Sequence, residues 1–131
     1  MSDSRRRVVI TGLGAITPVG NDVPATWGQL LAGGSGAAPI TIFEATAEFT
    51  SRIACEVKNF DPLNFLEKKE ARRYDRFAQF SVGAAAEAMR SAGLEGAPHG
   101  VSAERFGVIF GSGIGGIATM EAQHDQMRAR G

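Results

Sequence analysis

Residues 106–116 read FGVIFGSGIGG, a short apolar run that passes directly into a glycine-rich loop. The run is apolar at successive positions, which is typical of a strand covered on both faces, as in a parallel sheet. The loop leads into residues 117–130, where Met120, His124 and Met127 form one stripe at helical spacing. This strand–loop–helix unit predicts an α/β fold.

A similar pattern opens the chain. Residues 8–10 (VVI) form a second β-branched run, and residues 11–14 (TGLG) follow it with two glycines that allow a sharp turn. A third strand is expected over residues 52–58, where apolar and polar side chains alternate. Cys55 belongs to the apolar set of that strand, so we expect it to be buried and structural.

Two helices are expected between these strands. The first begins at Asp22, which can accept a hydrogen bond from a free amide, and has Pro24 in its first turn. The second covers residues 75–91, and its many Ala and Gly residues predict close packing against several neighbours. The buried face of the first helix is expected to carry three large side chains, Trp27, Leu30 and Leu31.

The order of these elements is strand–helix, repeated three times, which is that of a layered α/β domain. Strands that are apolar on both faces, and a helix of small residues, need more covering layers than three strands and three helices provide. Residues 1–131 are therefore expected to be the N-terminal piece of a larger protein.

The composition of the chain argues against several classes of protein and site. The 131 residues hold 14 Lys and Arg against 14 Asp and Glu, so no basic excess suggests nucleic-acid binding. One cysteine excludes a disulfide framework and a multi-cysteine metal site. No apolar run approaches the roughly 20 residues of a membrane span, and the apolar run at residues 8–10 is too short for a signal peptide. A cytoplasmic location is expected.

The glycine-rich loop has two interpretations. Gly111, Gly113 and Gly116 fit the G-x-G-x-x-G pattern between a strand and a helix, which is typical of dinucleotide binding. The confirming acidic residue at the end of the next strand would lie beyond Gly131. The alternative is a loop that passes close to other backbone.

Four residues that could carry chemistry have simpler interpretations. Glu121 and His124 stand at i, i+3, which is half of a carboxylate di-metal signature, but the chain contains no second Glu-x-x-His. His99 lies between Pro98 and Gly100 and is expected on the surface. Cys55 is not near a helix start that would activate a thiol.

A local basic cluster stands out in this neutral chain. Residues 68–73 (KKEARR) hold four cations, either as a solvated helix face or as a dock for a phosphate or an acidic protein. Lys69, Arg72 and Arg73 lie at i, i+3 and i+4, so a helix through them would place them on one face.

Taken together, these motifs resemble the β-ketoacyl-[acyl-carrier-protein] synthases, and among them synthase II. The resemblance covers nearly the whole chain in the family's order, over residues 8–14 (VVITGLG), 17–20 (TPVG), 27–36 (WGQLLAGGSG), 60–62 (FDP), 69–75 (KEARRYD) and 110–116 (FGSGIGG). It implies the N-terminal part of a thiolase-like layered αβαβα fold. It also implies decarboxylative condensation of malonyl carrier protein with an enzyme-bound acyl group, in fatty-acid elongation.

The resemblance also assigns roles to particular residues. The family's catalytic cysteine and two histidines are not identified here, because Cys55 lies in IACEV and neither His99 nor His124 matches, so this chain alone is expected to be inactive. Ile114 matches the residue that gates the acyl-chain pocket. The resemblance implies that Lys69, Arg72 and Arg73 are the residues that dock the acidic acyl carrier protein.

The implied enzyme needs no metal or organic cofactor, acts on acyl and malonyl thioesters, and is a homodimer when intact. Three alternatives stay open: a polyketide-type ketosynthase, a nucleotide-binding oxidoreductase using the loop, and an interaction domain that binds an acidic protein. A downstream cysteine motif with two histidines would support the synthase, and an acidic residue ending the next strand would support the oxidoreductase.

Overall fold

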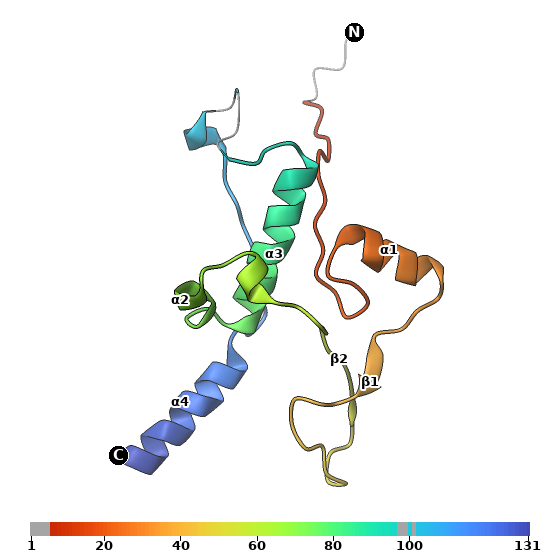
Figure 1. Cartoon of the computed structure of the whole chain (residues 1–131). Helices are drawn as coiled ribbons and strands as arrows, with labels where there is room; N and C mark the ends of the chain where they lie inside the picture. Colours follow the sequence, from red (N-terminus) through yellow and green to blue (C-terminus); the bar gives the residue numbers. More distant parts are fainter. Residues whose placement is uncertain (1–5, 97–99, 101) are drawn as a thin grey trace.

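The computed structural model describes residues 6–96, 100 and 102–131. Figure 1 shows α3 at the centre, with the N-terminal segment and α1 on one side of it and α2 on the other. The elements are helices α1 (Val23–Leu31), α2 (Lys68–Ala71), α3 (Arg76–Ser91) and α4 (Ile117–Arg130), strands β1 (Ala37–Pro39) and β2 (Ile53–Cys55), and 3₁₀ turns η1 (Pro62–Asn64) and η2 (Ala103–Arg105). No helix in this part of the chain is long and apolar enough to cross a membrane.

One face of α3 carries the N-terminal segment. A Cβ atom added at Gly14 would overlap the carbonyl oxygen of Ala84, and one added at Gly12 would overlap that of Ala88. The expected sharp turn is therefore not what these glycines serve here. They let the extended backbone lie directly on a stripe of alanines, which confirms the close packing predicted for this helix.

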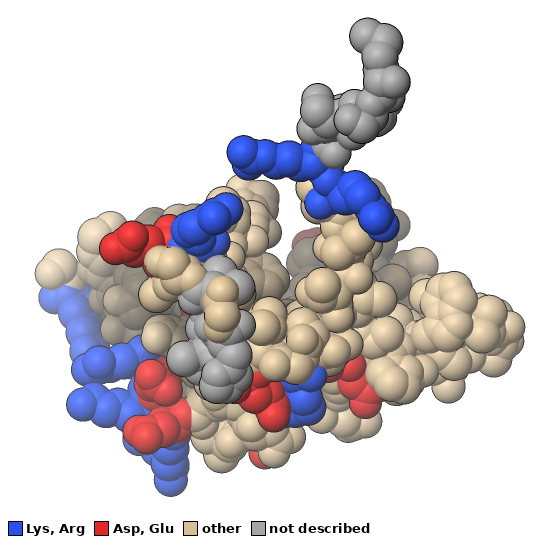
Figure 2. Space-filling view, turned by 90° about the horizontal axis from the view of Figure 1, so that it is seen from above, with Lys and Arg blue, Asp and Glu red and all other residues tan. Residues whose placement is uncertain are grey.

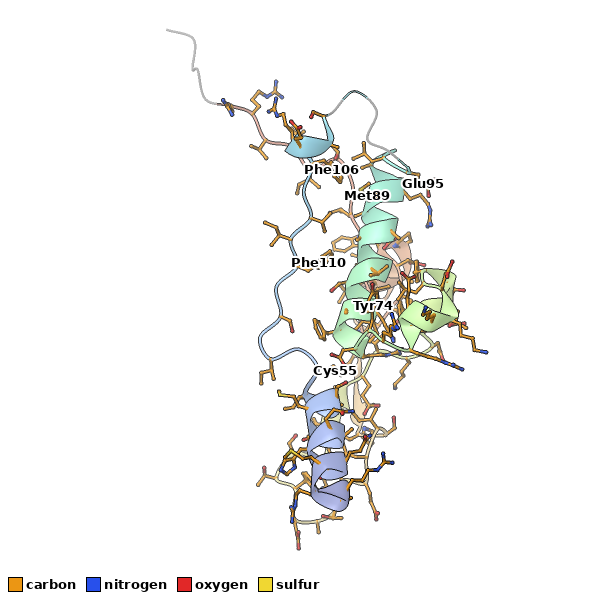
Figure 3. The ribbon with its side chains drawn as sticks, turned by 90° about the vertical axis from the view of Figure 1, so that its left-hand side faces the viewer. Cys55, Tyr74, Met89, Glu95, Phe106 and Phe110 are labelled. Carbon is orange, nitrogen blue, oxygen red and sulfur yellow. The ribbon has the colours of Figure 1, made fainter. Side chains whose placement is uncertain are left out.

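A second face of α3 meets the segment that precedes the glycine-rich loop. Val82 and Ala85 line an apolar cavity of about 360 Å³ together with Val108 and Phe110. Figure 3 shows Phe110 pointing from its extended segment toward α3. The small side chains of α3 thus allow a second segment to approach it, although an apolar cavity remains between the two.

The third face of α3 holds the best-packed part of the described chain. Phe60 is 7% exposed, stacks on Phe65 at 5.8 Å between ring centroids, and meets Phe80 edge-on at 5.1 Å. The Arg76 guanidinium covers both rings, 5.1 Å from the Phe60 centroid and 4.8 Å from that of Phe80. Gly83 leaves room for the Phe60 ring.

The helix start expected at Asp22 is confirmed. Its carboxylate accepts a hydrogen bond from the Ala25 amide, and Pro24 lies in the first turn of α1. The expected burial of Trp27, Leu30 and Leu31 is wrong, since each is more than half exposed. Within the described residues no helix or sheet covers this face of α1.

The sheet in the described chain has two short antiparallel strands. β1 pairs with β2 in the register Ala37↔Cys55, Ala38↔Ala54 and Pro39↔Ile53. The strand expected over residues 52–58 is therefore present but shorter. The expected burial of Cys55 is wrong: its side chain is exposed, because among the described residues no second layer covers this hairpin.

The strands expected at residues 8–10 and 106–110 do not form among the described residues. Both segments are extended but belong to no ladder among the described residues. Ile10 is 82% exposed and Ile109 is 98% exposed. A strand exists only through hydrogen bonds to a neighbouring strand, and neither segment finds one here.

Candidate functional site

The glycine-rich loop is anchored at its far end. Gly115 adopts a left-handed φ of 78° and lies against the ring of Phe77, and Gly116 lies against the Asp75 carboxylate. A side chain at either glycine would meet these groups. The loop then becomes α4, whose first and last residues agree with the predicted helix. Close approach to α3, and not a free phosphate cradle, explains these two glycines.

The geometry does not favour the dinucleotide interpretation. A pyrophosphate would occupy the N-terminus of α4, where free amides attract anions. The carboxylate of Asp75 already lies there, against Gly116 and hydrogen-bonded to the Thr119 hydroxyl. Its negative charge would repel a phosphate. Ile114 is 72% exposed, so its side chain is displayed on the open side of the loop.

The basic cluster forms one turn of helix and the residues directly after it. A capping box between Glu67 and Glu70 starts α2, which ends at Ala71. The expectation that one helix face carries all three docking residues is therefore wrong, because Arg72 closes the helix and Arg73 lies beyond it.

The three predicted docking residues are nevertheless available at the surface. Lys69, Arg72 and Arg73 are exposed, and no carboxylate of the described residues forms an ion pair with them. In Figure 2, several Lys and Arg side chains protrude along the left-hand side of the molecule, the side on which α2 lies in Figure 1, with Asp and Glu side chains beside them. This local positive surface can attract an acidic partner although the chain is neutral overall.

A buried glutamine holds this segment in place. The Gln79 side chain, 9% exposed, donates hydrogen bonds to the carbonyl oxygens of Ala71 at 2.8 Å and of Tyr74 at 2.9 Å. These carbonyls flank Arg72 and Arg73. Sequence reasoning missed Gln79, because its partners are backbone groups that any residue could supply.

The residues that directly follow the predicted docking cations lie beside the end of the glycine-rich loop. Tyr74 and Asp75, which follow the cationic cluster, line one cavity of about 440 Å³ together with Gly115, Gly116 and Thr119. Two features that are about 40 residues apart in sequence are thus joined at the start of α3.

A second missed residue is Glu87. One carboxylate oxygen accepts from the Ala15 amide at 2.9 Å and the other from the Val23 amide at 2.8 Å. Glu87 therefore ties the N-terminal segment and the first turn of α1 to α3. It borders a cavity of about 570 Å³, which Asn21 and Arg90 also line. Its position as a lone acid within an Ala-rich stretch was the available signal.

The remaining candidate residues form no reactive group. No cluster of three or more metal-binding side chains occurs among the described residues. His124 is exposed and lies 3.8 Å from the Asp125 carboxylate. Cys55 is exposed and lies in β2, not at the start of a helix. The prediction for His99 lies outside the described residues.

Comparison with known proteins adds the family. A model of the β-ketoacyl synthase N-terminal domain matches residues 5–131. Similar proteins include 3-oxoacyl-[acyl-carrier-protein] synthase 2 of Staphylococcus aureus (strain N315), 45% identical over 96% of this chain. The corresponding enzymes of Coxiella burnetii and Vibrio harveyi are 46% and 44% identical over 97% and 98% of it. The chain spans about 30% of the length of each of these relatives.

The structure is also similar to a solved one, the ishigamide ketosynthase/chain length factor. The TM-score is 0.76 at 32% sequence identity, over 96% of this chain and 30% of the solved one. The chain therefore belongs to the β-ketoacyl synthase family and carries the N-terminal part of its thiolase-like layered fold.

Proposed function

We propose that residues 1–131 are the N-terminal segment of a 3-oxoacyl-[acyl-carrier-protein] synthase II. The whole enzyme would condense malonyl carrier protein with an enzyme-bound acyl group and release carbon dioxide. The names and the 44–46% identities of the curated relatives support this elongating type over a polyketide-type ketosynthase. The nucleophilic cysteine and the two histidines of the reaction would come from outside this segment.

In this proposal the segment serves two tasks. Lys69, Arg72 and Arg73 dock the acidic carrier protein, and Ile114 forms part of the acyl-pocket wall. The observation that carries the proposal is that Tyr74 and Asp75, which directly follow the exposed cations, share a cavity with Gly115 and Gly116 of the glycine-rich loop at the start of α3. A carrier docked on the cations would deliver its acyl chain near this loop.

The remaining features of the enzyme follow from the same proposal. Its substrates are acyl and malonyl thioesters, and the prosthetic arm that carries them belongs to the carrier, so the enzyme itself needs no cofactor. The intact enzyme would be a cytoplasmic homodimer.

The test reverses the charge of the cluster in the longer protein that contains this segment. Arg72→Glu with Arg73→Glu should raise KM for carrier-borne substrate about tenfold at low salt, because docking charges mainly set the association rate. The effect should shrink as salt rises. Turnover of a small thioester without a carrier should stay unchanged.

A matched control reverses two exposed arginines that lie next to each other elsewhere in the chain, Arg6→Glu with Arg7→Glu. This double variant changes the net charge by the same amount. It should leave KM near the wild-type value. Equal KM values for both double variants would show that the cluster is only a solvated surface.

A further inference from the structure

Asp75 occupies a position where aspartate normally serves its own helix. It is the residue before α3, and an aspartate there usually accepts a hydrogen bond from an amide of the first turn. Here the carboxylate makes no such bond. It instead accepts from the hydroxyl of Thr119 in α4 and lies against Gly116. The side chain joins two segments that are 44 residues apart in sequence.

This contact fixes the loop at the end where it enters α4. Gly115 packs on the Phe77 ring beside it, so the junction between loop and α4 rests on the first turn of α3. Ile114 directly precedes the junction, and it is exposed. Among the described residues, Gly111 and Gly113 have no neighbour within 4 Å of a would-be Cβ, so the backbone between Phe110 and Ile114 has no close contact of this kind.

We propose that Asp75 is a positioning residue for acyl-chain selectivity: with Thr119 it fixes the glycine-rich loop, and so sets where Ile114 stands. This inference rests on the proposed function of Ile114 as part of the acyl pocket. A side chain that limits chain length must be held to a fraction of an ångström, because a shift of about 1 Å changes which chains fit. Glycines give the loop no stiffness of its own, so the stiffness comes from its anchor.

Two variants remove the contact in different ways. Thr119→Val keeps the shape of the side chain and all charges but loses the hydroxyl, and Thr119→Ser restores the hydroxyl. In the 131-residue chain, hydrogen exchange of amides 115–119 should speed up about threefold or more in Thr119→Val, as expected for loss of one hydrogen bond. It should stay near wild type in Thr119→Ser. Unchanged exchange in Thr119→Val would overturn the anchor.

The functional readout is the ratio of kcat/KM for a long and a short acyl carrier substrate in the longer protein. Thr119→Val and Asp75→Ala should each change this ratio about threefold, in the same direction, and combining them should add little because both break the same contact. KM for the carrier should stay constant in Thr119→Val, which alters no charge. Thr119→Ser should keep the wild-type ratio.

Ile114→Phe separates the two levels of the proposal. If Ile114→Phe changes the ratio but Thr119→Val does not, Asp75 is a structural residue only, and the inference is wrong while the proposed function stands. If Ile114→Phe leaves the ratio unchanged, the loop is not part of the acyl pocket, and both are wrong.

Discussion

The aromatic cluster on α3 and the two apolar extended segments are made of similar residues but reach different states. Phe60 is buried between Phe65, Phe80 and the Arg76 guanidinium. Ile10 and Ile109 stand almost fully exposed. The cluster draws its partners from residues 60–83, whereas a strand needs a neighbour that can be far away in sequence.

The difference shows which parts of the fold are packed within these 131 residues and which parts lack a partner among the described residues. Helix α3 receives a chain segment on each of three faces. The contacts through Gly12, Gly14 and Gly83 are close-packed, whereas the contact with Val108 and Phe110 leaves an apolar cavity. The two apolar segments could each form a strand but have no partner strand among the described residues, so their apolar side chains and backbone groups are exposed to water. In the enzyme we propose, further chain would cover them.

The largest expected effect breaks the packing on α3. Gly14→Val would place a side chain where the Ala84 carbonyl oxygen lies, so the N-terminal segment must move away. We expect a loss of about 2–3 kcal/mol in the free energy of unfolding, measured by urea denaturation. Gly28→Ala is the control: it lies inside α1 with nothing within 4 Å, and should stabilise by about 0.5–1 kcal/mol. Similar losses in both would contradict the packing account.

A smaller effect tests the polar tie on the same helix. In Glu87→Gln one carboxylate oxygen becomes an NH₂ group, which cannot accept a hydrogen bond, so either the Ala15 or the Val23 amide loses its partner. Urea denaturation should show a loss of about 1–2 kcal/mol. Glu95→Gln, which removes an exposed pair with Arg90, should cost under about 0.5 kcal/mol. If the two variants are equally stable, Glu87 does not hold these segments.

The helices and the strands differed in how well the sequence predicted them. The bounds of α3 and α4 and the cap at Asp22 could be predicted because helical hydrogen bonds join residues four apart. The isolated state of the segments at residues 8–10 and 106–110 could not, since an apolar pattern shows that a strand is possible but not that its partner is present.

Some parts of the candidate site could be predicted from the sequence and others could not. The exposed cations and the glycine-rich loop could be found from the sequence as local motifs. Their junction at Asp75, and the ties made by Gln79 and Glu87, could not, because each side chain bonds to a group that has no local signature. The amide that Glu87 holds at Ala15 lies 72 residues away.

The smallest effect concerns the hairpin, which lies apart from α3. Hydrogen bonds from the Thr41 hydroxyl and amide, and one from the Ile42 amide, lower the pKa of Glu56 below its ordinary value of 4.5. A lowered pKa means that the ionised form stabilises the fold above the unfolded pKa, and that this contribution is lost as the pH falls through the folded pKa.

The Thr41 amide resonance should therefore titrate with a midpoint below 4.5. Glu56→Gln should abolish the titration while the Ala85 amide on α3 stays unaffected in both proteins. A midpoint at or above 4.5 would show that the turn does not hold the carboxylate.

Hydrogen exchange compares the two regions most directly. It would follow the same amides in the 131-residue chain and in the longer protein that contains it. The account predicts that residues 79–88 of α3 are protected in both, and that residues 8–10 and 106–110 exchange fast in the chain but slowly in the longer protein. Equal exchange of these two segments in both proteins would contradict the claim that they become strands only when further chain covers them.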